Sequence, residues 1–402
     1  MSNVIIVGGG ASGLIAGIIA ARQKHKVTIL EQKDKIGKKI YATGNGKCNY
    51  TNLIQTPDCY RSNNPNFPLL ALEQFDVNKT IEFFKQLGIY PKERKGYLYP
   101  NSEQAASIVD VLTMELNRLK VKILCEVRVE KIKKDNDFLI TTNKGKFQAD
   151  KVILAAGGCA SPNLGSDGSG FLLAKELGHK IIKPIPALVQ LKSKEKYFKT
   201  LAGVRVEAGI KLLINKEYVT EESGEVLMAN YGVSGIPIFQ ISRYAARAIS
   251  ENKKVELVID YMPDLNWKEV YQFLIDRIHS NTEKNMEELM IGLFHHKLSY
   301  IMLKEAGIPV DLPCQKANQK QVSDLVNQIK EWHIPISEPN SFEQAQVSAG
   351  GVDTNEINPV TMESKLVKGL HFAGEVIDVD GTCGGYNLQW AWTTGYIAGM
   401  GL

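Results

Sequence analysis

The sequence predicts an α/β fold in which one domain is built from both ends of the chain and is interrupted by inserted modules. Residues 4–31 follow the order strand, glycine-rich turn, helix and strand, which is typical of a parallel sheet with both faces covered. A strand, a glycine-rich loop and a helix return at residues 370–398. From about residue 184, short strands separated by turns replace this pattern and indicate an antiparallel insert.

These changes of pattern predict three structural parts. The parallel-sheet domain comprises residues 1–185 and 346–402, a barrel-like antiparallel β insert comprises residues 186–262 and 331–345, and a small helical insert comprises residues 263–330. The length of 402 residues suits this organisation, because a domain has roughly 150 residues. The composition, with 44% hydrophobic and 23% charged residues, excludes disordered, collagen-like and coiled-coil proteins.

The net charge and the cysteines bear on the protein's partners and on its cellular compartment. A net charge of +4 neither requires nucleic acid as a partner nor excludes it. None of the six cysteines forms a C-x-x-C pair, so neither a zinc ribbon nor a thioredoxin-type redox pair is expected, and scattered cysteines fit a reducing cytoplasm. The apolar run from Val4 to Ala21 lacks a preceding basic segment and contains five glycines, so we expect no signal peptide and no membrane anchor.

The clearest secondary-structure signals lie in the first thirty residues or so. Val4–Val7 and Val27–Leu30 are short apolar runs rich in β-branched residues, and the Ala- and Ile-rich stretch Leu14–Arg22 between them has helical composition. Residues 37–52 are instead rich in Gly, Asn and Thr, which predicts a long loop of functional importance. Further helices are predicted at residues 80–87, 104–119, 170–177, 267–278, 286–304, 319–330 and 388–398. Further strands are predicted at residues 121–129, 138–142, 152–156, 188–191, 204–213, 225–228, 255–259 and 370–375.

The turn after the first strand carries the motif Gly8-x-Gly10-x-x-Gly13, with Glu31 at the end of the second strand. In such a turn the first glycine permits the tight bend, the second lets the backbone approach a pyrophosphate, and the third lets helix pack on strand. The helix N-terminus supplies free N–H groups for phosphates, and the acid accepts a hydrogen bond from a ribose hydroxyl. The motif in this context predicts a Rossmann-like dinucleotide-binding domain.

The C-terminal segment favours FAD over NAD as the nucleotide. The strand ending at Phe372-Ala373-Gly374-Glu375 is followed by Asp378 and Asp380, which suits the ribityl and pyrophosphate end of FAD. The helix after Gly384-Gly385-Tyr386-Asn387 can direct its positive N-terminal dipole at the flavin edge that becomes negative on reduction.

Five blocks of this sequence form a pattern that is longer and more specific than the single motifs. The first is the loop block Thr43–Asn52 and the last is Gly384–Ala391. Between them lie Tyr231–Gly235, Ala345–Val352 and Phe372–Gly381. In these blocks the sequence resembles the BaiN/YhiN-type (RdsA-like) NAD(P)/FAD-dependent oxidoreductases, and the resemblance covers essentially the whole chain. It implies a Rossmann-like FAD domain with β and helical inserts, tightly bound FAD, and reduction of carbon–carbon double bonds with NAD(P)H.

The motifs and the resemblance together define the expected FAD contacts. They are Gly8, Gly10, Ala11, Ser12, Gly13, Glu31, Gln32, Lys33, Lys39, Thr43, Gly44, Asn45, Gly46, Cys48, Asn49, Val127, Ala155, Ala156, Gly157, Gly374, Glu375, Asp378, Gly385, Tyr386, Asn387 and Leu388. A second complete G-x-G-x-x-G unit for a nicotinamide nucleotide is absent, so Ala155–Gly157 is expected to pack beside FAD. NAD(P)H would then bind only transiently, or another donor would reduce the flavin.

Reducing an activated double bond requires a proton donor as well as a hydride donor. Cys48 lies in the Gly/Asn-rich loop, Cys383 precedes a predicted helix N-terminus, and Tyr386 begins that helix. A cysteine at a helix N-terminus tends towards a lowered pKa. We therefore name these three as candidate acids, with Cys48 preferred, while packing roles for each remain open. No metal site is expected, because His295 and His296 have no third ligand at a useful spacing.

Three functions are compatible with the sequence. The first is reduction of uridine to dihydrouridine in ribosomal RNA, the second is reduction of a small enone or enoyl substrate of the bile-acid-intermediate type, and the third is a flavin-containing binding or redox-sensing protein. Residues 22–47 hold eight Lys and Arg against two Asp and Glu, which mildly favours RNA. Lys38, Lys39 and Lys47 would then contact phosphates. The sequence does not predict the oligomeric state.

Overall fold

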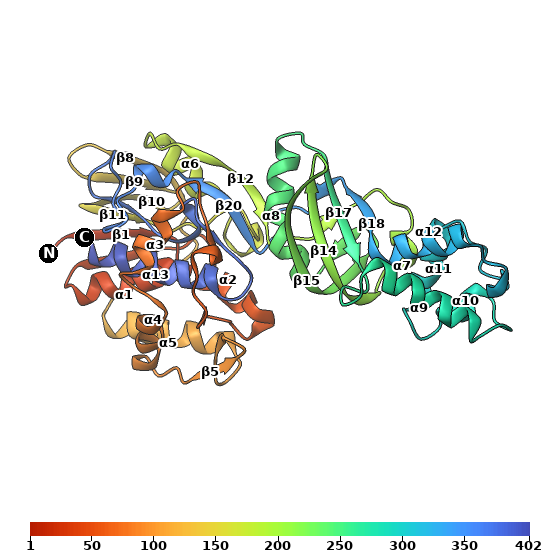
Figure 1. Ribbon diagram of the computed structural model, residues 1–402. Coiled ribbons are helices and arrows are strands. Elements are labelled where there is room, and N and C mark those ends of the chain that lie inside the picture. Colours follow the sequence, from red (N-terminus) through yellow and green to blue (C-terminus); the bar gives the residue numbers. More distant parts are fainter. The chain divides into compact units, whose positions relative to one another are not determined.

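The computed structural model describes all 402 residues, which divide into two compact units. The first unit comprises residues 1–186 and 342–402 and therefore contains both chain ends, and the second comprises residues 187–341 (Figure 1). The predicted α/β class with a Rossmann-like parallel sheet is confirmed.

The core of the first unit is a five-stranded sheet in the order β21-β11-β1-β2-β7. Its strands are β1 (Asn3–Val7), β2 (Lys26–Leu30), β7 (Lys122–Leu124), β11 (Lys151–Leu154) and β21 (Leu370–Phe372). Every neighbouring pair is parallel, so all five carboxyl ends lie at one edge. Val4 and Ile6 are fully buried and Ile5 nearly so, because both faces of the sheet are covered.

One face of this sheet carries two packed helices, α1 (Ala11–Arg22) and α13 (Tyr386–Met400), as Figure 1 shows. Two glycines of α13, one turn apart, let it lie directly on α1. A Cβ atom added at Gly395 would lie 2.4 Å from the carbonyl oxygen of Ser12, and one at Gly399 would lie 2.9 Å from that of Ala16. The two helices therefore touch backbone to backbone, which fixes one against the other.

The opposite side of the sheet carries an antiparallel layer of three strands, in which β10 contacts β1 (Figure 1). Its strands are β8 (Val129–Lys134), β9 (Phe138–Thr142) and β10 (Gly145–Ala149). The other strands of this unit are β3 (Thr51–Asn52), β4 (Tyr60–Arg61), β5 (Pro91–Arg94), β6 (Tyr97–Pro100), β12 (Ile181–Ala187), β20 (Val347–Val352) and β22 (Asp380–Gly381). Its other helices are α2 (Lys38–Ala42), α3 (Asn66–Leu72), α4 (Val77–Gln86), α5 (Ala105–Arg118) and α6 (Ser169–Glu176).

Two local predictions in the first unit were wrong. The strand predicted at residues 121–129 is two strands, β7 and β8, in different sheets. Between them Glu126 adopts a left-handed backbone (φ 58°) and the chain turns back, because the N–H groups of Glu126 and Val127 donate to the carbonyls of Lys33 and Glu31. The loop predicted at residues 37–52 also contains a short helix, α2, in its first part.

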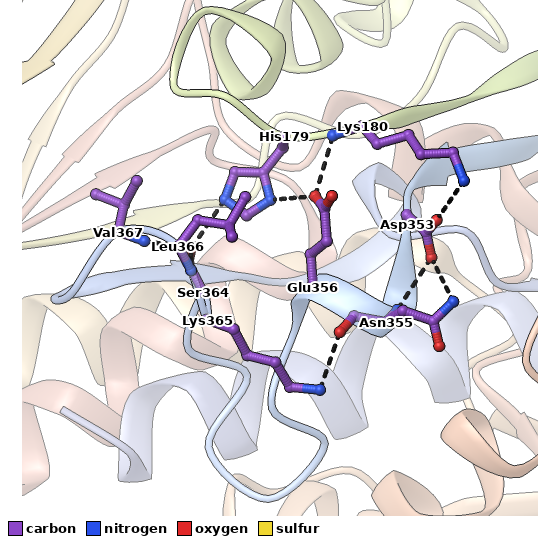
Figure 2. A network of polar contacts seen from close by, with 9 residues as sticks. All are labelled: His179, Lys180, Asp353, Asn355, Glu356, Ser364, Lys365, Leu366 and Val367. Carbon is purple, nitrogen blue, oxygen red and sulfur yellow. Dashed lines mark hydrogen bonds and ion pairs between the residues drawn. The ribbon is translucent and has the colours of Figure 1, made fainter.

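A buried polar network fixes the chain just before β12 (Figure 2). His179 Nδ1 lies 2.9 Å from the Glu356 carboxylate, and His179 Nε2 lies 2.8 Å from Ser364 Oγ. Because Ser364 Oγ already accepts the N–H groups of Leu366 and Val367, its own hydrogen points to Nε2. Burial lowers the pKa of His179, which favours this neutral ring. The serine is buried and its oxygen is occupied, so the network is structural and not a nucleophilic triad.

The second unit contains a seven-stranded sheet in the order β18-β17-β14-β15-β16-β13-β19. Its strands are β13 (Leu191–Lys192), β14 (Arg205–Ile214), β15 (Glu217–Ala229), β16 (Gly232–Ser234), β17 (Val255–Asp260), β18 (Trp332–Ile336) and β19 (Glu338–Pro339). The first and last strands of the order, β18 and β19, are separated in the chain only by Ser337. The sheet must therefore curl strongly, although its pairing does not close into a barrel.

Helices complete the second unit. They are α7 (Phe198–Leu201), α8 (Ile236–Ser250), α9 (Trp267–His279), α10 (Met286–Met290), α11 (His296–Glu305) and α12 (Gln319–Lys330). The predicted helix at residues 286–304 is interrupted, because Gly292 has a left-handed backbone (φ 85°) between α10 and α11. Helix α8 was not predicted, although Gly235 followed by Pro237 marks its start.

The α1–α13 crossing predicts the effect of one added methyl group. Gly395→Ala should reduce the free energy of unfolding by about 1–3 kcal/mol, because the new Cβ would meet a backbone oxygen that cannot rotate away. On an open helix the same change would stabilise by about 1 kcal/mol. The measurement is chemical denaturation, with Gly209→Ala as control, since a Cβ there has no contact closer than 3.6 Å. A more stable Gly395→Ala variant would contradict the close crossing.

Candidate functional site

The carboxyl ends of adjacent parallel strands bring four predicted segments together. The turn Gly8–Gly13 follows β1, Glu31 follows β2, Ala155–Gly157 follows β11, and Gly374 comes shortly after β21. These four strands are neighbours in the sheet, so the segments lie side by side at its edge. Ligands of open α/β sheets bind at this edge.

The glycine turn is shaped by close backbone contacts. A Cβ at Gly8 (φ 106°) would lie 2.4 Å from the Ala155 carbonyl oxygen, and one at Gly13 would lie 2.0 Å from the Gly8 carbonyl oxygen. A Cβ at Gly10 would meet nothing within 4 Å. Gly10 is also the N-cap residue of α1, and no side chain caps that helix or places an acid in its first turn. The turn therefore presents free N–H groups to an open space.

Glu31 is a buried carboxylate that organises the same turn. Its two oxygens accept the N–H groups of Gly9, at 2.8 Å, and of Lys33, at 2.7 Å. Burial raises the pKa of Glu31, while these backbone hydrogen bonds oppose the rise. Each oxygen keeps a second lone pair, so the carboxylate can still accept from a hydroxyl. Val127 donates its N–H to the Glu31 carbonyl, and Gln32 donates its side-chain amide to Gly165.

A second group of predicted residues lies at the N-terminus of α13. Gly385 is its N-cap residue with a left-handed backbone (φ 93°), and no side chain caps the helix. A Cβ at Gly385 would lie 2.9 Å from the Thr51 carbonyl oxygen and 3.0 Å from Asn49 Oδ1. Asn49 Oδ1 is buried and has no hydrogen-bond partner. An uncapped helix N-terminus and an unsatisfied acceptor therefore lie next to each other.

Two predicted residues, Lys39 and Glu375, form an ion-paired junction that also includes Ser348, which was not predicted. Lys39 Nζ lies 2.8 Å from Glu375 Oε2, and Glu375 Oε1 accepts the N–H of Ser348 at 2.8 Å. Ser348 Oγ in turn accepts the N–H groups of Cys159, at 2.7 Å, and Ala160, at 3.1 Å. The junction joins α2, β20 and the segment after β11. Lys39 and Glu375, both predicted to contact FAD, therefore form an ion pair with each other.

The remaining predicted FAD contacts lie at positions that do not by themselves indicate a ligand. Ala11 and Ser12 open α1, and Ser12 Oγ donates to the Ala373 carbonyl. Asp378 is buried and accepts the N–H of Asn63, and the Asn387 side chain accepts from and donates to the backbone of Gly381. Leu388 lies in the first turn of α13. Exposed or half-buried turn residues make up the rest, namely Thr43, Gly44, Asn45 and Gly46.

The three candidate proton donors differ in access. Cys48 is fully buried, and burial raises the pKa of its thiol to about 12. Tyr386 is buried, its hydroxyl donates to the Ile54 carbonyl at 2.8 Å, and burial raises its pKa. Cys383 is partly exposed and lies two residues before the N-cap of α13. Access and acidity therefore disfavour Cys48, which the sequence had favoured, and leave Cys383 the best placed.

The lysines expected to contact RNA are all ion-paired. Lys38 lies 2.5 Å from Asp34, Lys39 pairs with Glu375, and Lys47 lies 3.3 Å from Glu103. The local positive charge that favoured RNA is therefore partly neutralised, and two of the three carboxylates involved, Glu375 and Glu103, lie outside the segment whose charges were counted.

No cluster of three or more His, Cys, Asp or Glu side chains is arranged to hold a metal ion. The chain also has no helix of the length and apolarity that crossing a bilayer requires.

Comparison with known proteins matches residues 2–401 to the model described as HI0933-like protein Rossmann domain. The chain belongs to this family. Among its relatives, a 3-dehydro-bile acid delta(4,6)-reductase of Clostridium scindens is 45% identical, with 99% of this chain and 98% of the relative covered. Ribosomal RNA dihydrouridine synthases of Haemophilus influenzae and Escherichia coli are 33% and 30% identical, each with 100% of this chain and 98% of the relative covered.

The resemblance drawn from the sequence motifs is thus confirmed. The predicted enzyme class, an FAD-dependent oxidoreductase, is also confirmed.

The residues present fit FAD. The backbone cradle of Gly8–Gly13 leaves open space at Gly10 beside free helix N–H groups, which suits a pyrophosphate. The unsatisfied Asn49 Oδ1 beside Gly385 calls for a donor, and the isoalloxazine ring carries one. The α1–α13 crossing holds these two places in one unit.

Sequence patterns alone did not identify several residues that build this site. Gln389 is fully buried, and its amide contacts Thr51 and Thr80, at 2.6 and 2.9 Å, on two other elements. Both Gln389 and Ser348 lie inside the blocks that resemble the family, so the signal was present in the block and not in a chemical motif.

Glu31 supplies a direct test of the first half of the site. Glu31→Gln should weaken FAD binding by roughly ten- to a hundredfold, equivalent to about 1.5–3 kcal/mol, because it removes the charge and turns an amide donor towards a backbone N–H. FAD affinity is measured by fluorescence titration of the apoprotein. The control is Glu126→Gln, which changes an exposed carboxylate of the adjacent loop. This variant should bind FAD as the wild type does. Equal affinities for both folded variants would show that the ribose is held elsewhere.

Proposed function

We propose that this chain binds FAD across the N-termini of α1 and α13 and reduces an activated carbon–carbon double bond of a small unsaturated substrate, with NAD(P)H as the electron donor. The single observation that carries the choice of substrate is the 45% identity, over 99% of the chain, to a bile acid delta(4,6)-reductase. The relatives that act on ribosomal RNA are more distant, at 33% and 30%.

The chain's own groups define what it contributes to the reaction. The free N–H groups at Gly10 and the start of α1 would hold the pyrophosphate, and Glu31 would accept from the ribose. The N-terminal turn of α13 would hold the flavin ring and stabilise negative charge there. Bound FAD, once reduced by NAD(P)H, would supply a hydride to the double bond.

The proton must come from the protein or from water. Of the three candidates we propose Cys383, since Cys48 is fully buried with a pKa of about 12 and the Tyr386 hydroxyl already donates to Ile54. A helix N-terminus close by favours a reactive cysteine.

Reduction of uridine in ribosomal RNA is the second candidate. The observation in its favour is a cluster of three exposed cations, Lys47, Lys92 and Arg94, around the single carboxylate of Glu103. These cations hold the pKa of Glu103 at about 2, well below its usual range. The cluster keeps an excess of positive charge close to the loop block at residues 43–52, where RNA phosphates could bind.

The substrate classes are separated by one kinetic comparison. The reduced holoenzyme is mixed anaerobically with a conjugated 3-oxo steroid or with a uridine-containing ribosomal RNA fragment, and flavin reoxidation is followed by absorbance. We expect rapid reoxidation and loss of the enone absorbance with the steroid, with little dependence on salt. If only the RNA reoxidises the flavin, and if salt and the double variant Lys92→Ala/Arg94→Ala both slow that reoxidation, RNA replaces the small molecule as the proposed substrate.

The proton donor is tested in the same assay. Cys383→Ala should leave reduction of the flavin by NADH or NADPH intact and slow its reoxidation by substrate by about 10²–10⁴-fold, the usual range for loss of a general acid. Cys48→Ala and Tyr386→Phe should slow it far less. A wild-type rate in Cys383→Ala, with a slow rate in either of the other variants, would move the role to that residue.

A further inference from the structure

The side-chain oxygen of Asn49 is a buried acceptor beside the α13 N-terminus that makes no hydrogen bond within the protein. It lies 3.0 Å from the position that a Cβ on Gly385 would occupy. A buried polar group without a partner destabilises a fold by about 1–3 kcal/mol. Such a group therefore needs an explanation, and a partner outside the chain supplies one where the group faces a ligand site.

Asn49 is held firmly, because the residues after it are anchored on two sides. The N–H of Tyr50 donates to the Leu98 carbonyl in β6 at 2.9 Å, and the Tyr50 carbonyl accepts from the Trp392 indole of α13 at 2.8 Å. Asn52 donates its side-chain amide to the Gly384 carbonyl at 3.0 Å. These bonds tie the strand after Asn49 to both β6 and α13.

Gln389 adds a fully buried connection. It accepts from Thr51 Oγ1 at 2.6 Å and donates to Thr80 Oγ1 at 2.9 Å and Thr393 Oγ1 at 3.0 Å. The amide thereby links β3, α4 and α13 with its hydrogen-bonding capacity used. The unsatisfied oxygen of Asn49 is thus a fixed feature beside a fixed helix end.

The chemistry of the two neighbours is complementary to one edge of an oxidised flavin. The pyrimidine edge of that ring presents acceptor, donor and acceptor in turn, at O2, N3–H and O4. The first turn of α13 offers N–H donors without a side-chain cap, and Asn49 offers an acceptor. A phosphate or carboxylate would match the helix end but not Asn49 Oδ1, because neither carries a donor when ionised.

We propose that Asn49 Oδ1 accepts the hydrogen bond from the N3–H group of the flavin, while the N-terminal turn of α13 faces the adjacent O2. The proposal rests on the proposed binding of FAD. Asn49 then selects the protonated N3 and orients the ring, and the helix end stabilises the charge that reduction places at N1 and O2.

The decisive readout is the pH at which bound oxidised FAD loses its N3 proton, followed by absorbance. A hydrogen bond from N3–H favours the protonated form, so Asn49→Ala should move this ionisation down by about one pH unit. Asn49→Asp keeps an acceptor of nearly the same shape and adds negative charge, so it should move the ionisation up and lower the flavin midpoint potential. Asn136→Ala, at an exposed turn of the same unit, should change neither quantity.

A second measurement uses an altered flavin. FAD methylated at N3 should bind the wild type more weakly than FAD, and Asn49→Ala should lose most of that discrimination because it removes the acceptor and leaves room for the methyl group.

The outcomes separate the two proposals. Failure of the wild type to bind FAD would end the proposed function itself. Normal FAD binding in all variants, with the N3 ionisation unmoved by either Ala or Asp and no discrimination against methylated FAD, would overturn the role of Asn49 and leave the function standing. If Asn49→Ala does not fold, a rise with Asn49→Asp supports the proposal and its absence overturns it.

Discussion

The direct contact between α1 and α13 is the constraint on which the site depends. These helices come from opposite ends of the chain, and both N-termini are uncapped by side chains. Gly395 and Gly399 bring the helix backbones together, because a Cβ at either position would lie within 3 Å of a backbone oxygen of α1. The distance between the two helix ends is therefore fixed by backbone atoms. A cofactor long enough to reach both ends meets a site that is already formed, so little free energy is used to order it.

The second consequence of this crossing is electrostatic. The N-termini of α1 and α13, which are the positive ends of their helix dipoles, both lie in the first unit. The buried carboxylate of Glu31 is held by backbone N–H groups and not by a cation. The nearby lysines Lys38, Lys39 and Lys47 are each committed to a carboxylate. The positive charge that this edge of the sheet offers to an anion therefore comes mainly from the backbone, and the surrounding lysines join segments of the fold.

Local patterns were sufficient to predict the elements that carry the cofactor motif. The strand Val4–Val7, the glycine turn and the last helix all have signals within a few residues, and the structure has β1, α1 and α13 there. Patterns of this kind failed where distant partners decide. Residues 121–129 look like one strand, but the backbone of Lys33 and Glu31 turns the chain at Glu126.

A charge count over a short segment omits distant partners for the same reason. Lys39 was counted within residues 22–47, whereas its partner Glu375 is 336 residues away in the sequence. The unsatisfied oxygen of Asn49 is likewise invisible in sequence, because it depends on the contacts of β3, β6 and α13. The thiol of Cys48 was expected to be reactive from its Gly/Asn-rich surroundings, yet the fold buries it.

In the proposed function the two helix ends form one site for a single FAD. The most direct measurement is to denature the purified, flavin-reconstituted protein and identify and quantify the released flavin by chromatography. We expect close to one FAD per chain, because the AMP half is needed to fill the Gly8–Gly13 turn and to reach the Glu31 carboxylate, while the ring fills the α13 end. Recovery of FMN alone, or of no flavin, would contradict it.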